Sequence, residues 1–217
     1  MNIRRTVISA LSAAGVLITL NSPAVSAEVR PPSLPPPGSV VVTLLNINGS
    51  GCRPGTVRVA NEVETIDMSY SEHMAQTGGD SRPPDYRKRC AVTLDVTAPP
   101  EFTYAIVEAS YNGYASLRPG ASAHLKARFR YSQSTIRSGQ HQLAGPFSGD
   151  WMFVDEDDVS QTIFKPCDEK NEVALDTELQ VNLDTSDETK ISFISLDPFN
   201  IKPHNFYKLA WKRCSTA

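Results

Sequence analysis

The chain has 217 residues, of which 40% are hydrophobic and 21% charged, a balance typical of folded globular proteins. Outside the N-terminus, no apolar run approaches the roughly 18 residues that a membrane-spanning helix needs. Lys and Arg total 21 and Asp and Glu total 24, and the first 27 residues hold two of the arginines and no acid. Without that segment the formal net charge is −5, which argues against a general nucleic-acid binder.

The N-terminus has the pattern of a secretion signal. Arg4 and Arg5 precede a mostly apolar run over Val7–Leu20, Pro23 interrupts any helix, and Val25–Ala27 supplies the small residues that a signal peptidase reads. We expect a signal peptide over residues 1–27, cleaved after Ala27. The alternative, a single membrane anchor, is disfavoured because the apolar run is too short.

A proline-rich segment follows. Residues 28–39 hold five prolines, which favour an extended and unpaired backbone, so we expect a stiff segment before the fold. The remainder, 40–217, is expected to form a single disulfide-stabilised domain.

Period-two alternation of apolar and polar residues dominates this remainder and predicts about ten strands. They are expected at 40–47, 55–60, 66–71, 90–97, 102–110, 121–131, 150–155, 173–183, 190–196 and 205–213. No segment sustains a 3.6-residue period. The pattern predicts an all-β protein, an antiparallel β-sandwich with Greek-key or jelly-roll connections.

The longest stretch without a strand pattern is Glu72–Arg89, which ends beside Cys90. Long loops pinned by a disulfide often carry function. Asp85, Arg87 and Lys88 are therefore candidate binding residues. The alternative is a structural role, with Arg87 paired internally to a carboxylate.

Tyr111 and Tyr114 flank Asn112-Gly113, a dipeptide typical of a two-residue hairpin turn, although it can also mark a bulge in one longer strand. Exposed aromatic rings at a turn can stack on sugars, so both tyrosines are candidate binding residues. A cross-strand aromatic pair is the structural alternative.

A basic stripe occupies one face of the strand 121–131. Its members are His124, Lys126, Arg128 and Arg130. It could bind an anionic polymer, but Asp176, Glu178 and Asp184 lie on the polar face of the strand 173–183 or just after it. We favour cross-strand pairing between the two sets, which would leave no free binding surface.

An acidic run follows Trp151. Asp155, Asp157 and Asp158 could provide oxygen ligands for Ca²⁺, although the register does not fit an EF-hand. A solvated acidic turn is the favoured alternative, and no other cofactor is expected.

Four cysteines in an oxidising compartment imply two disulfides. They are Cys52, Cys90, Cys167 and Cys214. Three connectivities are possible, and we favour Cys52–Cys90 with Cys167–Cys214 because sequential pairing keeps the closed loops short. A zinc site is disfavoured, since metal-binding cysteines usually come in closely spaced pairs.

Common catalytic motifs are absent from the sequence, including the nucleophile elbow, the zinc-protease helix motif and the phosphate-binding loop. The four histidines, at positions 73, 124, 141 and 204, show no ligand spacing. Asn48-Gly49-Ser50 is an N-glycosylation sequon, with meaning only in a eukaryotic host.

Several short stretches, in a fixed order and with all four cysteines inside them, carry a family resemblance. They are Gly49–Cys52, Gly55–Val57, Asp85–Cys90, Phe102–Ala105, Tyr111–Ala115, Gly145–Pro146, Trp151–Asp155, Pro166–Cys167 and Leu209–Cys214. The chain resembles the secreted family catalogued as domain of unknown function 4360, found in bacteria and fungi. The resemblance implies a signal peptide, a β fold with one disulfide in each half, and an extracellular location. It implies no catalytic residues.

These observations favour a secreted, non-catalytic protein that binds an extracellular protein or glycan. One alternative is an extracellular hydrolase that uses the carboxylates near Trp151. Another is an inhibitor of secreted proteases, presenting a rigid loop at Glu72–Arg89.

Overall fold

Twelve strands and one short 3₁₀ helix make up the described part of the chain, which in this computed structural model covers residues 34–131, 134–157, 162–196 and 205–215. The side chains of residues 134–136 are outside this description. The predicted signal peptide, the first part of the proline-rich segment, Asp158 and His204 also lie outside the described residues. The described residues belong to one unit, Pro32–Ala217.

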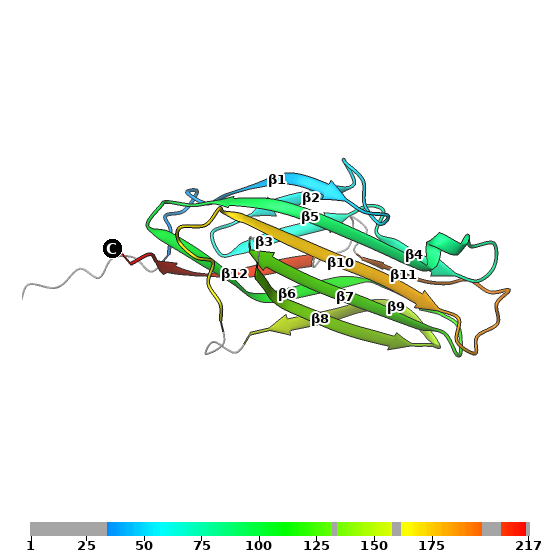
Figure 1. Cartoon of the computed structure of the whole chain (residues 1–217). Helices are drawn as coiled ribbons and strands as arrows, with labels where there is room; N and C mark the ends of the chain where they lie inside the picture. Colours follow the sequence, from blue (N-terminus) through cyan, green and yellow to red (C-terminus); the bar gives the residue numbers. More distant parts are fainter. Residues whose placement is uncertain (1–33, 132–133, 158–161, 197–204, 216–217) are drawn as a thin grey trace, which may run out of the picture. The chain divides into compact units, whose positions relative to one another are not determined.

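One sheet has five strands in the order β1-β5-β10-β7-β8. Its strands are β1 (Val41–Asn48), β5 (Arg87–Thr97), β10 (Glu172–Asn182), β7 (Ser122–Tyr131) and β8 (Ser134–Ala144). Every pairing in it is antiparallel. The central strand β10 is therefore flanked by β5 and β7, which are distant in sequence (Figure 1).

The other sheet has seven strands and is also antiparallel. Its strands are β2 (Val57–Asn61), β3 (Thr65–Tyr70), β12 (Asn205–Arg213), β6 (Phe102–Leu117), β11 (Ser192–Leu196), β4 (Met74–Thr77) and β9 (Phe147–Glu156). The long strand β6 pairs with β12 along its first part, with β11 near its end, and with β9 as well. The predicted all-β, antiparallel sandwich-like fold is confirmed.

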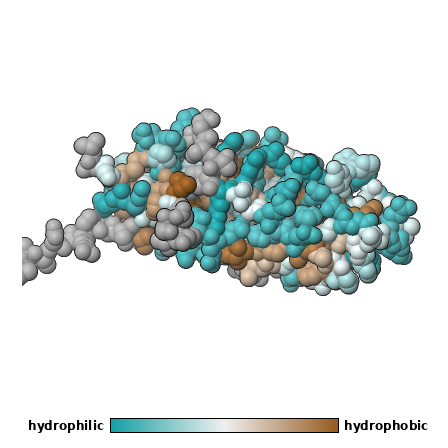
Figure 2. Space-filling view, turned by 60° about the horizontal axis from the view of Figure 1, so that its bottom comes forward, coloured by the Kyte–Doolittle hydropathy of each residue, from teal (hydrophilic) through white to brown (hydrophobic). Residues whose placement is uncertain are grey.

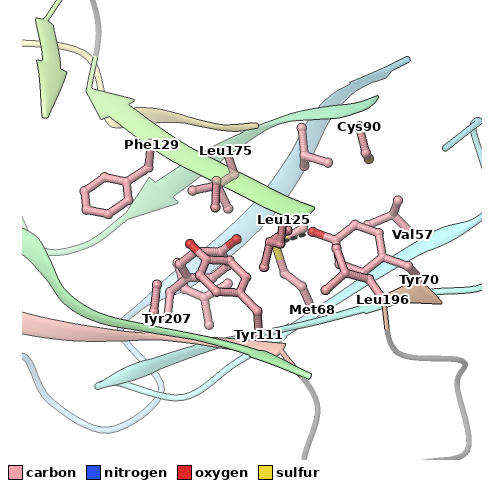
Figure 3. Packing of buried hydrophobic residues seen from close by; sticks show 14 of the residues in the cluster. Val57, Met68, Tyr70, Cys90, Tyr111, Leu125, Phe129, Leu175, Leu196 and Tyr207 are labelled. Atoms are coloured by element: carbon pink, nitrogen blue, oxygen red, sulfur yellow. Dashed lines mark hydrogen bonds between the residues drawn. The ribbon is translucent and has the colours of Figure 1, made fainter. Parts of the chain in front are cut away.

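The core lies between the two sheets because alternate residues of each strand point inward. Along β10, Val173, Leu175, Thr177, Leu179 and Val181 are buried while their neighbours are partly exposed. Figure 3 shows Leu125, Phe129 and Leu175 of the five-stranded sheet facing Tyr111 and Tyr207 of the other sheet. This alternation places the polar residues of β10 on the outer face of its sheet.

The two sheets are also joined by a polar contact. The Ile106 amide of β6 donates a hydrogen bond of 2.6 Å to the hydroxyl of Tyr131 on β7. The Tyr104 and Tyr131 rings meet edge to face at 5.4 Å. A buried hydroxyl with a partner avoids the cost of desolvating a lone polar group.

Two strands and one turn differ from the sequence expectations. The segment Glu72–Arg89 contains the strand β4 and the 3₁₀ helix η1 (Pro83–Tyr86), so it is not a continuous loop. The strand β8 was not predicted, because its residues are largely polar. Asn112-Gly113 lies inside β6 and forms no hairpin turn.

The cysteines form two disulfides, as predicted from their number. Cys52 bonds to Cys90 and Cys167 bonds to Cys214, which is the sequential connectivity. The first links the Gly49–Gly55 segment to β5, and the second links residue 167 to the end of β12.

Most of the surface shown in Figure 2 is hydrophilic, with smaller hydrophobic patches. Among the described residues, no helix is long and apolar enough to cross a membrane.

Candidate functional site

A hollow of about 450 Å³ lies on the outer face of the five-stranded sheet. We call it the β10 groove. It is lined by Arg87, Arg89, Lys126, Ala127, Arg128, Ser138, Gly139, Gln140, Asp176, Thr177 and Glu178. Strand register explains this grouping, because Asp176 is opposite Arg128 on β7, and Glu178 is opposite Lys126 on β7 and Arg89 on β5.

Asp176 lies between two arginines and bonds to both. Arg89 donates from Nη2 to Oδ1 and Arg128 donates from Nε to Oδ2, each over 2.9 Å. Arg87 pairs with Glu178 over 2.6 Å. The predicted cross-strand pairing therefore holds for Arg128, whereas Glu178 pairs with β5 and not with the stripe.

The electrostatic environment keeps the Asp176 carboxylate ionised. Burial alone would raise the pKa of Asp176, but hydrogen bonds from Arg89 and Arg128 outweigh it and hold the pKa below its usual value. The carboxylate thus remains a fixed negative charge at neutral pH, and it orients both guanidinium groups.

Cations remain in excess in the groove. Four basic side chains line it (Arg87, Arg89, Lys126 and Arg128) against two carboxylates. Within the described part of the chain, the Lys126 ammonium has no hydrogen-bond or ion-pair partner, and the exposed Arg130 guanidinium on the same strand has none either. The basic stripe is therefore only partly neutralised by its neighbours.

Asp85, Arg87 and Lys88 do not form one binding surface. Asp85 is buried and accepts hydrogen bonds from Lys88 (2.8 Å) and from the Arg82 side chain (3.2 Å). These contacts lower the pKa of Asp85 from 3.8 to about 2, with Lys88 contributing most. Asp85 and Lys88 thus fix η1 against β5, and Arg87 is the member of this set that reaches the groove.

Tyr111 and Tyr114 lie on opposite faces of β6. The Tyr111 ring is 2% exposed and packs edge to face on Tyr207 at 6.2 Å, so it cannot contribute to a surface sugar platform. Tyr114 is partly exposed, stacks on Phe193 and shares a hydrogen bond of 3.1 Å with Ser148. The expectation of an exposed ring is wrong for Tyr111, because Asn112-Gly113 continues β6 and makes no turn, and the binding role of Tyr114 stays a prediction.

The acidic run faces the strand β8. Asp155 lies 3.0 Å from His141 Nε2, and Asp157 pairs with Arg137 over 2.9 Å. His141 also stacks on Phe153, with ring centroids 4.5 Å apart. Asp155 on β9 and Asp157 directly after it therefore link this part of the chain to β8. Among the described residues, no group of three or more acidic, His or Cys side chains is placed to hold a metal ion.

His73 is a buried histidine that the sequence does not distinguish from a surface one. Its Nε2 shares a hydrogen bond of 2.9 Å with Thr177 of β10, while Nδ1 has no partner among the described residues. Burial lowers the pKa of His73 to about 3, and the bond with Thr177 opposes this only in part. The imidazole is therefore neutral at physiological pH and packs beneath the groove.

Sequence reasoning missed Arg89, Ser138 and Gln140 as groove residues. Arg87 and Arg89 carry a signal that could have identified them, since they continue the outward-facing alternation of the predicted strand 90–97. Ser138 and Gln140 carry no such signal, because they lie on the unpredicted strand β8.

Comparison with known proteins gives one family match, in which the model of a domain of unknown function (DUF4360) matches residues 38–214. An uncharacterized secreted protein of Arthroderma benhamiae is 24% identical over 184 residues, which are 83% of this chain and 74% of that protein. The solved structure of TmCBM61 in complex with beta-1,4-galactotriose has a TM-score of 0.28 and 12% identity, over 82% of this chain and 90% of that one. At that TM-score the similarity supports no shared ligand.

Proposed function

The chain belongs to the DUF4360 family of secreted proteins, and from that premise we propose that it is a non-catalytic extracellular protein that binds a glycan in the β10 groove. The observation that carries this proposal is the groove itself. Its lining combines guanidinium, amide, hydroxyl and carboxylate groups on three neighbouring strands.

Such a set of groups suits a hydroxyl-rich ligand. Sugar hydroxyls both donate and accept hydrogen bonds, and the groove offers donors from Arg89, Arg128 and Gln140 beside acceptors from Glu178. The ion pairs that hold Arg89 and Arg128 reduce the side-chain entropy lost on binding, which improves affinity without new contacts.

The hydrolase alternative has less support. The carboxylates near Trp151, Asp155 and Asp157, are each engaged by a basic side chain of β8 and serve the packing of two strands. The inhibitor alternative needs a protruding loop at Glu72–Arg89, where the chain instead forms β4 and η1. No specific feature of the described residues favours the hydrolase or the inhibitor.

The proposal is tested by thermal unfolding of the oxidised secreted protein against a panel of neutral and charged oligosaccharides. A glycan present at 100 times its dissociation constant should stabilise the native state by about 2.7 kcal/mol. Gln140→Ala should reduce this shift, while the matched variant Gln76→Ala on the other sheet should keep it.

Two results would contradict the proposal. One is the absence of any glycan-dependent shift across the panel. The other is cleavage of the oligosaccharide during incubation with the protein, because a non-catalytic protein does not hydrolyse its ligand.

A further inference from the structure

We infer that the ligand of the β10 groove is an acidic polysaccharide, one whose sugars carry carboxylate or sulfate groups. This inference rests on the proposed glycan binding and specifies the class of glycan. The supporting observation is an excess of cations in the groove, which the strand register places on the outer face of the five-stranded sheet.

The charge of the groove is opposite to that of the chain. The protein without its predicted signal has a net charge of −5, yet the groove holds four basic side chains and two acidic ones. Arg130 extends the basic row along β7. A local positive surface on an acidic protein attracts anions at short range, while the overall charge suppresses non-specific contact with them.

The basic side chains of the groove still have N–H groups that can donate hydrogen bonds to a ligand. Arg87, Arg89 and Arg128 are each about half exposed, at 55%, 51% and 52%. Among the described residues, each guanidinium uses a single N–H toward a groove carboxylate, whereas arginine has five. Lys126 has all three N–H groups available. The remaining N–H groups suit bidentate contacts with carboxylate or sulfate oxygens.

The spacing suits a linear polymer. Adjacent strands are about 4.8 Å apart and alternate residues along a strand about 7 Å apart, so two rows of cations run on either side of β10. The rows are formed by Arg87 and Arg89 on β5 and by Lys126 and Arg128 on β7. A chain lying along β10 would therefore meet Arg89 and Lys126 on its two sides at the level of Glu178, with Arg87 and Arg128 at the adjacent levels on alternate sides.

Nucleic acids fit the groove less well. None of the residues that line it is aromatic, so there is no surface on which bases could stack. Phosphate contacts dominate the affinity for duplex DNA, and the four basic side chains of the groove could neutralise only a few phosphates.

The test compares polygalacturonate with its fully methyl-esterified form, and dextran sulfate with dextran, by titration calorimetry. The members of each pair share a backbone and differ in charge. We expect binding to the charged member of at least one pair, weakening severalfold as salt rises from about 50 to about 500 mM. Lys126→Glu should weaken binding roughly tenfold, because it replaces an attraction with a repulsion.

Lys208→Glu provides the matched control. Lys208 is exposed on β12 of the other sheet, so this variant changes the net charge equally and should bind like the original protein. Normal thermal unfolding of Lys126→Glu would show that the variant is folded.

The possible failures can be distinguished. Equal binding to charged and neutral members would overturn the inference and leave the proposed glycan binding intact. Binding to poly-glutamate or single-stranded DNA but to no polysaccharide would overturn both. An equal loss of affinity for the charged polysaccharide in Lys126→Glu and Lys208→Glu would also overturn the inference. The effect would then come from the net charge of the protein and not from the groove.

Discussion

Arg128 and Asp176 are direct partners on adjacent strands, and Arg128 Nε lies 2.9 Å from Asp176 Oδ2 on the outer face of the five-stranded sheet. Asp176 bonds to Arg89 through its other oxygen, so one carboxylate orients cations from both flanking strands. This relationship decides whether the basic stripe is a paired surface or a binding surface. The stripe is paired only in part, since four basic side chains line the groove against two carboxylates, and the proposed binding depends on this excess.

Asp176→Asn should therefore strengthen the binding of an acidic polysaccharide severalfold, because it removes a negative charge from the groove floor. Stability should fall by about 1 kcal/mol or less, since the two arginines remain half exposed to water. Calorimetry and urea unfolding measure the two effects. Asp67→Asn on β3 removes the same charge from the other sheet and should leave affinity unchanged. Weaker binding by Asp176→Asn would instead show that the orientation of Arg89 and Arg128 by Asp176 adds more to affinity than the negative charge of Asp176 subtracts.

The burial of His73 predicts a pH dependence of stability. Its folded pKa of about 3 is below the ordinary 6.5, so the unfolded chain binds a proton that the folded chain does not. Stability from this residue is complete above pH 6.5 and decreases as the pH falls toward 3. The slope of the free energy of unfolding against pH should approach about 1.4 kcal/mol per pH unit as the pH falls below 6, where the unfolded-state imidazole becomes fully protonated.

His73→Asn should remove this part of the pH dependence, as measured by urea unfolding at several pH values. His124→Asn should retain it, because His124 lies partly exposed on the outer face of β7. If His73→Asn and the original protein showed the same slope, the buried neutral imidazole would be refuted.

A substitution at Gly113 can test whether Asn112-Gly113 lies within the strand β6, as in the structure, or in a hairpin turn, as the sequence predicted. A Cβ at this position would overlap the Ser195 carbonyl oxygen of the paired strand β11 and the ring of Trp151. Gly113→Ala should destabilise the protein by about 3 kcal/mol or more, because backbone atoms would have to move. Gly149→Ala on β9 has open space around its Cβ and should be neutral or slightly stabilising in the same urea titration. A hairpin turn at Asn112-Gly113 would predict no such difference.

Removal of either disulfide should destabilise the protein by a similar amount, but the two removals should affect groove binding differently. Each closes a loop of similar length, with separations of 38 and 47 residues, so removal of either should cost about 4 kcal/mol in the chain-entropy account. Cys90 directly follows Arg89 on β5, whereas Cys214 lies at the end of β12. Cys52→Ala/Cys90→Ala should therefore reduce groove binding more than Cys167→Ala/Cys214→Ala, measured by calorimetry below both melting temperatures. Equal loss of binding would show that β5 does not depend on its disulfide for position.

Local sequence patterns were sufficient for much of the fold. The alternation along 173–183 predicted β10 closely, and the apolar residues of 121–131 predicted the buried face of β7, because one buried face requires a period of two. The same reasoning failed for β8, whose polar residues lie at the edge of a sheet. It also failed for Asn112-Gly113, where pairing with two neighbouring strands overrides the local preference for a turn.

The sequence by itself determined the all-β class, the two disulfides, the secreted character and the two charged strand faces, because each depends on composition or on neighbouring residues. Only the tertiary structure decided that β10 lies between β5 and β7, bringing Arg89 and Arg128 to one carboxylate. It likewise decided that Tyr111 is buried and that Asp155 and Asp157 bond to β8. These outcomes depend on pairings between residues far apart in the chain, and a shift of one residue in register would turn each polar face inward.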